Sequence, residues 1–318
     1  MLALAGVAVV APFPAALGAA QSFDLQAHAG GRGAATGESL RAFAKSLELG
    51  VSTLEFDINI TNDDQPLVWH DPTIMPDQCD DTGPAFPGDP QYPYVGKAVH
   101  DLTVAQIRTL SCGKPSNQFP RAEVVAGNKI ATLAEVFTLT DSYRAAVRYN
   151  IETKVQADQP QLSASPQEFV DVILAAVRSA GKTDRVEIQS FDWRTLPLVR
   201  EAEPSIPLVA LWNQHTWAPG SPWLAGIDPS AVSDPVVGAT MVGAGIVSPD
   251  YTLVAGRPFV DHAHALGLKV IPWTVDDAAA MRAQIADGVD GIITDYPALL
   301  RTVLADLGIP LPPAYHRS

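Results

Sequence analysis

Two stretches of the chain decide its fold, Thr53–Ile58 (TLEFDI) and Tyr149–Lys154 (YNIETK). In each stretch, charged and apolar residues alternate over the short length of a β-strand. Residues i and i+2 of a strand point to the same face, so Glu55 and Asp57 project together and the apolar residues between them project away. The Glu and Lys of the second stretch share a face in the same way. This pattern fits a barrel strand whose outer surface is covered by helices.

Further strand-like runs lie before, between and after these two stretches. The predicted strands, in chain order, are Asp24–Ala29, Thr53–Ile60, Arg148–Val155, Arg185–Phe191, Leu208–Trp212, Gly245–Ser248, Lys269–Thr274 and Gly291–Thr294. Helical patterns separate most of them; Leu40, Phe43, Ala44 and Leu47, for example, follow the spacing i, i+3, i+4, i+7. Eight strands that mostly alternate with helices predict an α/β protein, a (β/α)8 TIM barrel.

A doubly wound sheet is the alternative for such an alternation, and it usually binds a dinucleotide at a glycine-rich turn. The run Gly30–Gly33 (GGRG) does not have the G-x-G-x-x-G spacing of that turn, so we set dinucleotide binding aside. Near the end of the chain, Met281 and Ile285 followed by Gly288 predict a helix that ends at a glycine.

One segment breaks the alternation of strands and helices. Residues 72 to about 131 are rich in Pro, Gly and Asp, and a short helix is expected around Val104–Leu110. We interpret them as a small, loop-rich insertion after the second strand region. The segment holds both cysteines of the chain, Cys79 and Cys112, and neither belongs to a C-x-x-C motif. A disulfide between them would close a loop of about 33 residues and contribute ~3 kcal/mol.

Composition and charge exclude several classes of protein. The chain has 318 residues, of which 47% are hydrophobic and 18% charged, a mix that excludes a disordered or fibrous protein. Its 21 Lys and Arg residues against 35 Asp and Glu residues give a net charge of −14. A protein this acidic repels phosphate backbones, which argues against nucleic-acid partners and anionic membranes. Any phosphate that it binds must therefore meet a local cation, either a side chain or a metal ion.

The N-terminus has the character of an export signal. Residues Leu2–Ala20 are apolar or small and carry no charge, and Gly18 and Ala20 occupy the small-residue positions of a cleavage site. No Lys or Arg precedes this run, which departs from the usual pattern of such signals. A buried segment or a membrane span is the alternative, and two prolines disfavour the span. We expect residues 1–20 to be a signal peptide and 21–318 one barrel domain. The expected location is secreted or periplasmic, without a stable membrane anchor.

Residues that can do chemistry gather at the ends of the predicted strands. His28 closes the first strand, and His70 follows a short apolar run. If the charged faces of the two alternating stretches point into the barrel, their side chains lie at the same mouth as these histidines. Active sites of such barrels form at the carboxyl ends of the strands. Charges buried there without partners would cost several kcal/mol each. A hard divalent cation offsets that cost, and oxygen-only ligands suit Ca2+ or Mg2+ rather than zinc. For any single acidic residue, a salt bridge is the alternative.

The order and spacing of these motifs resemble the glycerophosphodiester phosphodiesterase family, a group of (β/α)8 barrels. The motifs that carry the resemblance are E-x-D (Glu55–Asp57), T-x-D (Thr61–Asp63), V-x-x-H-D (Leu67–Asp71), E-x-K (Glu152–Lys154) and the two closing strands, Gly267–Val275 and Gly288–Pro297. Together they cover most of the chain, from Asp24 to about Leu300.

The resemblance implies a metal-dependent enzyme that hydrolyses a small glycerophosphodiester to glycerol 3-phosphate and an alcohol. It implies that Glu55, Asp57 and Glu152 bind one divalent metal ion, with Ca2+ expected first and Mg2+ second. It also implies that His28 and His70 act as general acid and base, for which histidine has a suitable pKa. No protein partner is evident from the sequence.

The resemblance further implies that Lys154 helps to hold the phosphate and that Trp273 lines the pocket against the glycerol moiety, although burial in the core is a competing interpretation of Trp273. The chain departs from the family at Ala29, because the family's H-R-G motif has an arginine there. Arg32 is expected to reach the phosphate instead, and Glu38 to replace a glutamate shifted by one position. Since losing a preorganised donor commonly costs ~10²-fold in rate, we expect Ala29→Arg to raise activity.

Two other functions agree with the same residues. A related phospholipase would act on lipid headgroups, but the sequence has neither a basic face nor an amphipathic anchor for a bilayer. A barrel that binds phosphodiesters with little or no turnover would follow from the arginine missing at Ala29. Comparing the rates on micellar and on water-soluble substrates separates a phospholipase from an enzyme that hydrolyses small diesters. Binding of a phosphodiester without product formation identifies the barrel with little or no turnover.

Overall fold

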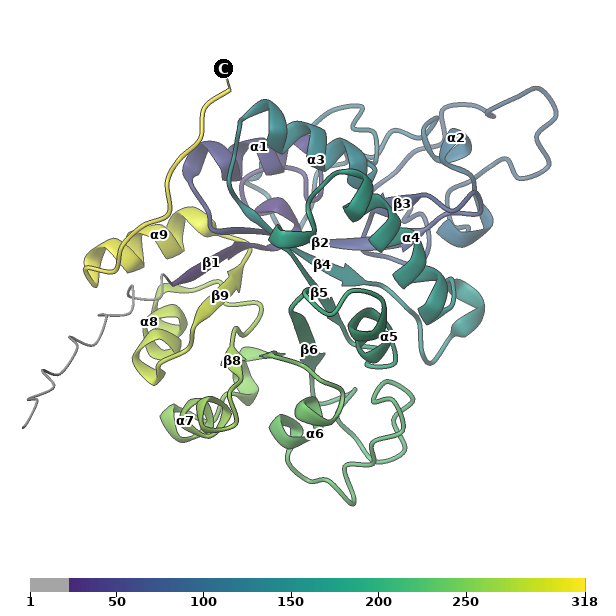
Figure 1. Ribbon diagram of the computed structural model, residues 1–318. Helices are drawn as coiled ribbons and strands as arrows, with labels where there is room; N and C mark the ends of the chain where they lie inside the picture. Colours follow the sequence, from purple (N-terminus) through teal and green to yellow (C-terminus); the bar gives the residue numbers. More distant parts are fainter. Residues whose placement is uncertain (1–22, 318) are drawn as a thin grey trace, which may run out of the picture.

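A computed structural model describes residues 23–317, in which eight parallel strands curl into a barrel (Figure 1). The strands, in the order in which they neighbour one another, are β8 (Lys269–Val270), β7 (Ile246–Pro249), β6 (Leu208–Trp212), β5 (Val186–Ser190), β4 (Arg148–Thr153), β2 (Thr53–Ile60), β1 (Asp24–Ala27) and β9 (Gly291–Thr294). Backbone hydrogen bonds from Asp290 N to Val270 O (2.9 Å) and from Ile293 N to Pro272 O (3.0 Å) join the two ends of this row. The predicted (β/α)8 barrel is therefore confirmed.

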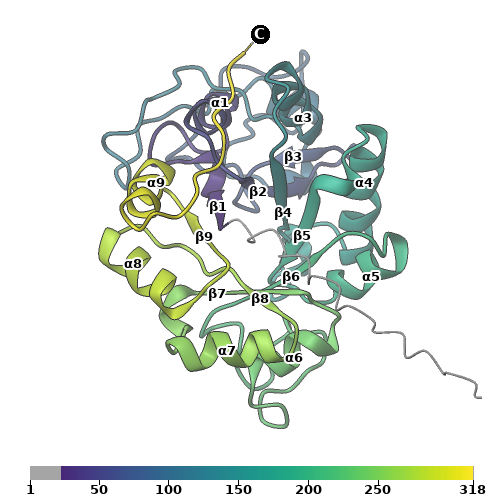
Figure 2. The ribbon, with the colours of Figure 1, turned by 60° about the vertical axis from the view of Figure 1, so that its left-hand side comes forward.

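Except for the short helix of the insertion, the α-helices surround this barrel on its outside, and Figure 2 shows them as a ring around the strands. The α-helices are α1 (Leu40–Leu49), α2 (Val104–Ile107), α3 (Leu133–Ser142), α4 (Pro166–Ser179), α5 (Thr195–Ala202), α6 (Pro235–Met241), α7 (Arg257–Ala265), α8 (Ala278–Asp287) and α9 (Pro297–Asp306). The short 3-10 helices are η1 (His28–Gly30), η2 (Val99–Asp101), η3 (Pro160–Leu162), η4 (Thr183–Arg185) and η5 (Tyr251–Leu253). As predicted, α8 ends at Gly288, whose φ of 94° suits a residue without a side chain.

The first predicted strand, Asp24–Ala29, is too long and is corrected by the structure. The strand ends at Ala27, because Ala29 and Gly30 have φ values of 47° and 73°, outside the extended region. His28 consequently lies in η1, a tight turn after the strand, rather than on the strand itself. This turn brings the chain over the mouth of the barrel.

Three other predicted strands also end early; Arg185–Phe191 ends one residue short, at Ser190. The predicted strand Lys269–Thr274 ends at Val270, since Pro272 has no N–H with which to continue the ladder. The predicted strand Arg148–Val155 ends at Thr153, although Lys154 N still donates a backbone hydrogen bond to Ile58 O of β2 (3.1 Å). A further strand that the prediction lacks, β3 (Pro66–Val68), runs antiparallel to β2 outside the row.

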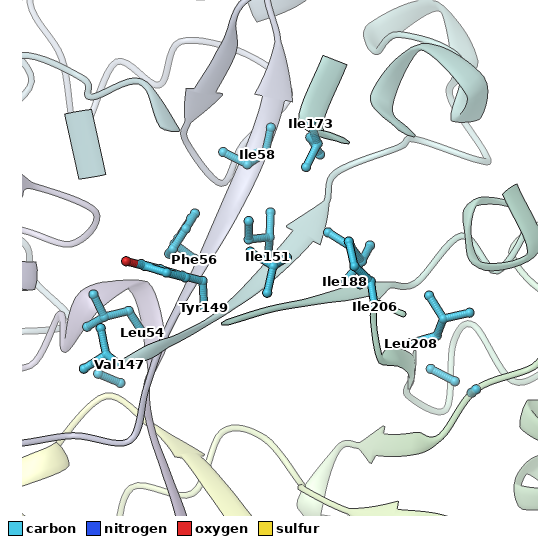
Figure 3. Packing of buried hydrophobic residues seen from close by; sticks show 14 of the residues in the cluster. Leu54, Phe56, Ile58, Val147, Tyr149, Ile151, Ile173, Ile188, Ile206 and Leu208 are labelled. Carbon is cyan, nitrogen blue, oxygen red and sulfur yellow. The ribbon is translucent and has the colours of Figure 1, made fainter. Parts of the chain in front are cut away.

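Apolar side chains fill the space between the strands and the helices. Leu54 and Phe56 of β2 lie beside Tyr149 and Ile151 of β4, all of them fully buried (Figure 3). Phe43 of α1 packs edge-on against Phe56, with ring centroids 5.5 Å apart. Burying a side chain of this size contributes about 1.5–3 kcal/mol relative to leaving it exposed. The apolar residues of the alternating stretches therefore face the helices, as their spacing predicts.

The inside of the barrel is divided into a polar half and an apolar half. The polar wall consists of buried residues of β1, β2, β4 and β5, namely Gln26, Glu55, Asn150, Glu187 and Gln189. The apolar wall comes from β6, β7, β9 and the segment after β8, namely Val209, Ile246, Ile271 and Ile293.

Hydrogen bonds link the members of the polar wall into one chain. Gln26 Nε2 donates to Glu187 Oε1 (2.9 Å), and Asn150 Nδ2 donates to Gln26 Oε1 (2.9 Å). Asn150 Nδ2 also donates to Gln189 Oε1 (3.0 Å), and Gln189 Nε2 donates to Glu55 Oε1 (2.6 Å). Because buried polar groups are stable only when paired, this chain supports the carboxylates that stand above it at the barrel mouth.

The insertion, residues 72–131, contains η2 and α2 and extends to one side of the barrel beyond β3 (Figure 1). Its small apolar core, in which Tyr94, Val99 and Leu102 are fully buried, also includes Leu67 of β3 and Trp69. A disulfide bond joins Cys79 to Cys112 inside this core. The insertion is therefore a packed structure rather than a loose loop.

The expected signal peptide, residues 1–20, lies outside the described residues. Between residues 23 and 317, no helix has the length and the apolar character needed to cross a membrane.

Candidate active site

Three buried carboxylates meet at the mouth of the barrel. Glu55 and Asp57 stand on one face of β2, and Asp57 is in register with Glu152 on the neighbouring β4. One ligand oxygen from each of these residues lies within 4.8 Å of the others. The structure thus brings together the three residues that the sequence nominates as metal ligands, as their spacing along the two strands requires.

The carboxylate cluster has the properties of a cation site. Asp57 Oδ2 is buried and has no hydrogen-bond partner among the described residues. Burial raises the pKa of Glu152 to about 8 and that of Glu55 to about 7, because Lys154 and His28 offset only part of the effect. Repulsion from the ionised Asp57 adds to this effect of burial, and a bound cation would remove both costs by stabilising the charged forms. An unpaired oxygen in a set of oxygen-only donors fits a hard divalent ion such as Ca2+ or Mg2+.

Lys154 places one protein cation beside this cluster. Its Nζ lies 2.9 Å from Glu152 Oε1 and 3.7 Å from Asp57 Oδ1. Burial lowers the pKa of Lys154, but Glu152 and Asp57 raise it by more, so it stays charged. The ammonium in turn holds the pKa of Asp57 below its usual value, against the opposing effect of burial. The structure therefore joins the predicted phosphate ligand to the predicted metal ligands.

A single buried carboxylate, Asp295, holds both His28 and Arg32. Its Oδ1 lies 2.6 Å from His28 Nδ1 and accepts a hydrogen bond from Arg32 Nε (2.7 Å). His28 Nε2 points to the carboxylate cluster, 4.0 Å from Glu55 Oε2. Burial lowers the pKa of His28, but Glu55 and Asp295 raise it by more, so the pKa lies above its usual value. Sequence reasoning misses Asp295; its place directly after the last strand was the available signal.

His70 lies at the open edge of the same mouth. It follows β3 and Trp69, whose backbone N donates to Asp57 O (3.0 Å) and so anchors this segment beside the cluster. The His70 side chain is 53% exposed, and its Nδ1 lies 3.4 Å from Asp71 Oδ1. It is close enough to the cluster to lower the pKa of Asp57. The two predicted histidines thus differ in burial but belong to one site.

A cavity of about 400 Å3 opens above these residues, between the barrel and the insertion. On the barrel side it is lined by Ala29, Arg32, Glu38, Asp57 and His70. On the insertion side it is lined by Asp77, Gln78 and residues 114–119, among others. This volume suits a small ligand.

Comparison with known proteins identifies the family. A model of the glycerophosphoryl diester phosphodiesterase family matches residues 28–299. This chain belongs to that family. The match spans both histidines and all three carboxylates described above. The family and the class of enzyme that the sequence motifs imply are therefore confirmed.

Individual relatives extend over nearly the whole chain. A glycerophosphodiester phosphodiesterase of Caldanaerobacter subterraneus subsp. tengcongensis is 27% identical over 262 residues, which are 82% of this chain and 89% of the relative. A solved protein from Silicibacter pomeroyi, provisionally named a glycerophosphoryl diester phosphodiesterase, has a TM-score of 0.76 and 28% identity over 92% of this chain and 96% of its own. An Oleispira antarctica phosphodiesterase, solved with the product sn-glycerol-3-phosphate, shares the fold at a TM-score of 0.67 and 17% identity, covering 89% of this chain and 96% of its own.

The departure from the family's H-R-G motif lies at the centre of the site. Ala29 has a φ of 47°, which is uncommon for a residue with a side chain, and its N donates to Glu55 Oε2 (3.0 Å). Gln189 Nε2 donates to the other oxygen of Glu55. Both oxygens of this predicted metal ligand are thus fixed by the protein. Sequence reasoning misses Gln189, since an uncharged residue on a strand carries no signal of this role.

Glu38, the expected replacement for a shifted family glutamate, lies against the same carboxylates. Its Oε1 accepts a hydrogen bond from Asp57 N (3.0 Å), and its φ is 56°. Burial raises the pKa of Glu38 well above its usual value, and the nearby Asp57 raises it further. Glu38 therefore contributes to the site by holding the backbone of β2 at Asp57.

Trp273 lies away from the carboxylates, on the apolar wall. It packs against the wall's apolar side chains, and its ring meets Phe191 edge-on with centroids 5.4 Å apart. Its Nε1 donates to Ser248 O (2.8 Å), so its polar atom is satisfied within the protein. Trp273 is partly buried, and it is not among the residues that line the 400 Å3 cavity.

Proposed function

We propose that this chain hydrolyses glycerophosphodiesters to glycerol 3-phosphate and an alcohol, with the help of one divalent metal ion. The observation that carries the proposal is the unpaired Oδ2 of Asp57 within a cluster of three buried carboxylates. His28 and His70 border the same mouth, and the family membership supports this reaction over others that a barrel of this kind performs.

Glu55, Asp57 and Glu152 are the residues that would hold the metal ion. Their donor atoms are all carboxylate oxygens, which favours Ca2+ first and Mg2+ second. When bound, the ion supplies positive charge to the non-bridging oxygens of the phosphodiester. Gln189 and the backbone N of Ala29 keep Glu55 in place for this role.

The two histidines move the protons of the reaction. One removes a proton from the attacking hydroxyl as its oxygen bonds to phosphorus, and the other protonates the leaving alkoxide as its P–O bond breaks. The hydroxyl belongs to water or to the glycerol of the substrate; in the second case a cyclic phosphate forms, which water then opens to glycerol 3-phosphate. Asp295 occupies Nδ1 of His28 and so leaves Nε2 for proton transfer on the cluster side. His70, at the exposed edge, is open to the substrate from the cavity.

Lys154 and Arg32 supply the protein's own positive charge to the phosphate. Lys154 does so from beside Glu152, and Arg32 from beside Asp295. Trp273, on the apolar wall, would contact the carbon atoms of the glycerol moiety. A protein with a net charge of −14 repels a phosphodiester at long range, so binding one requires local positive charge. Lys154 and Arg32 supply that charge.

Chelation tests both the metal and the reaction. The purified protein should hydrolyse glycerophosphocholine, lose at least about 10²-fold in rate with EDTA, and recover on addition of Ca2+. Asp57→Asn should lose activity to a similar extent, because it removes the charge from the unpaired oxygen. Asp158→Asn, on an exposed loop after β4, is the matched control and should behave as wild type. Activity that survives EDTA would contradict the metal role of the three carboxylates, and absence of hydrolysis would contradict the proposed substrate.

A slow or non-catalytic barrel is the second candidate, and Ala29 is the observation that favours it. This position lines the cavity without the family's arginine. In that case the protein would bind sn-glycerol 3-phosphate in the presence of Ca2+ but form product from glycerophosphocholine slowly or not at all. Measured turnover separates the two candidates directly.

We also propose an extracytoplasmic location. The disulfide between Cys79 and Cys112 supports it, because such bonds persist in oxidising compartments. The expected signal peptide points the same way. Fractionation of producing cells tests the proposal, and a cytoplasmic protein with both thiols free would contradict it.

A further inference from the structure

Arg32 lies on the loop between β1 and α1, and two glycines allow this loop to pack tightly. Gly33 N donates to Asp295 O (3.0 Å), and a Cβ at Gly33 would meet the Tyr296 ring at 2.5 Å. A Cβ at Gly37 would meet the Cβ of Arg32 at 2.9 Å. A side chain at Gly33 or Gly37 would displace the loop. The tight packing of these two glycines therefore fixes the backbone position of Arg32.

The guanidinium of Arg32 is held from two sides and keeps two nitrogens for a ligand. Its Nε donates to Asp295 Oδ1 (2.7 Å), and its Cζ lies 5.0 Å from the centroid of the Phe119 ring. Within residues 23–317, its two terminal nitrogens make no hydrogen bond. The side chain is 27% exposed and lines the cavity. Two free N–H-bearing nitrogens in one plane match two oxygens of a phosphate.

Phe119 belongs to the insertion, and this part of the insertion is docked on the barrel. Its ring meets Tyr296 edge-on, with centroids 6.1 Å apart, and only 8% of the residue is exposed. Close by, Glu123 N donates to Ala34 O (3.1 Å), and Thr36 N donates to Glu123 O (2.9 Å). The insertion therefore pairs directly with the loop that carries Arg32.

The segment that carries Phe119 is fixed on both sides. On one side, Cys112 is bonded to Cys79 in the core of the insertion. On the other, the Glu123 carboxylate forms ion pairs with Arg41 (3.0 Å) and Lys45 (2.7 Å) of α1. Because the segment is held at both ends, the position of the Phe119 ring relative to the barrel mouth is fixed.

We propose that Phe119 is a positioning residue that holds the Arg32 guanidinium as the phosphate-binding group of this chain, in place of the arginine absent at Ala29. The ring limits the guanidinium to one plane by a cation–π contact, and Asp295 fixes the rotation of its Nε. The insertion thereby belongs to the substrate site rather than only covering it. The inference rests on the proposed function, because it assumes that the ligand is a phosphate compound.

A double-mutant cycle tests this coupling. The variants are Arg32→Met, Phe119→Leu and the double variant, each titrated with inorganic phosphate in the presence of Ca2+ by calorimetry. Arg32→Met should weaken phosphate binding about 10-fold or more, since it removes a charge-assisted contact. Phe119→Leu should weaken it about 3- to 10-fold by loss of the cation–π contact. In the double variant, Phe119→Leu should add no further loss, because no guanidinium remains to be positioned.

Phe86→Leu provides the matched control, because Phe86 is in the same insertion but is 52% exposed and does not line the cavity. It should bind phosphate as wild type does. Wild-type affinity in Phe119→Leu or in Arg32→Met would overturn the proposal. Additive losses in the double variant would overturn it as well, since they would assign Phe119 a merely structural role.

Two further measurements keep the cycle decisive. If thermal unfolding shows that Phe119→Leu does not fold, Phe119→Met preserves the apolar volume and enters the same cycle. Phe119→Tyr keeps the ring and should retain wild-type affinity. A wild-type protein that binds phosphate but does not hydrolyse glycerophosphocholine would refute the proposed function alone, and the cycle would still decide the role of Phe119. Wild-type protein that binds no phosphate would overturn the inference itself.

Discussion

Asp295 is the residue whose replacement tests the site most directly. It is 1% exposed, and one of its oxygens serves both His28 Nδ1 (2.6 Å) and Arg32 Nε (2.7 Å). Asp295→Asn keeps the size of the side chain and an acceptor oxygen but removes the negative charge. The general acid–base group and the proposed phosphate ligand would then lose their common support without a cavity being created.

The expected size of the effect follows from these two contacts. Asp295→Asn turns each ion-paired hydrogen bond into one between a charged donor and a neutral oxygen. Since hydrogen bonds to charged groups span about 1.5–3 kcal/mol, we assign each contact a loss of about 1 kcal/mol. The two contacts together lose about 2 kcal/mol, which corresponds to a kcat/KM about 30-fold lower. Because Asp295 raises the pKa of His28, the limb of the pH–rate profile that His28 controls should also move to lower pH.

Steady-state hydrolysis of glycerophosphocholine as a function of pH measures both effects. Asp234→Asn is the matched control, since Asp234 pairs with exposed His262 (2.7 Å) on the surface of the barrel. It should leave kcat/KM and the pH profile unchanged. If folded Asp295→Asn has the kcat/KM and the pH profile of wild type, Asp295 does not position His28 and Arg32, and the reasoning above is refuted.

Two further predictions concern the barrel interior and the missing arginine. Burial, with Asp24 adding to it, raises the pKa of Glu187 to about 7 from 4.5, so the folded chain keeps this proton at a pH where the unfolded chain has lost it. Wild-type stability should therefore fall as pH rises through this window. Glu187→Gln should raise the free energy of unfolding by about 2 kcal/mol at high pH and by much less at pH 4.5; urea denaturation measures this, and an equal gain at both would contradict it. Ala29→Arg should raise kcat/KM about 10-fold in wild type. The gain should be larger in the Arg32→Met background, because the new guanidinium enters the same cavity and replaces the one that Arg32→Met removes. No gain in either background, in protein that folds and binds metal, would show that position 29 does not limit catalysis.

Local spacing was enough to predict the parts of the site that lie on strands. Glu55 and Asp57 share a face because they are two residues apart, and a parallel barrel brings the strand of Glu152 beside them. The resemblance to the family then supplied roles for these residues. Only the spacing within each strand and the expected barrel enter this reasoning.

The parts that could not be predicted depend on closure of the barrel and on the turns. Asp295 contacts His28 only because β9 pairs with β1 across 267 positions of sequence. The positive φ values of Ala29 and Glu38 take both residues out of the extended or helical geometry that a pattern assumes. The position of Phe119 over Arg32 depends on how the insertion docks, which composition does not encode.

The division of the barrel interior has a consequence for how this protein tolerates change. On the apolar wall, Val209 or Ile293 can exchange for other aliphatic residues of similar volume at a cost usually below about 1.5 kcal/mol. On the polar wall, each side chain is the partner of the next, so replacing Asn150 leaves both Gln26 and Gln189 without a donor, at about 1–3 kcal/mol for each unpaired group. Sequence drift should therefore concentrate on the side of the mouth that faces Trp273. New substrate preferences can arise there while the hydrogen-bonded polar wall that supports the carboxylates stays unaltered.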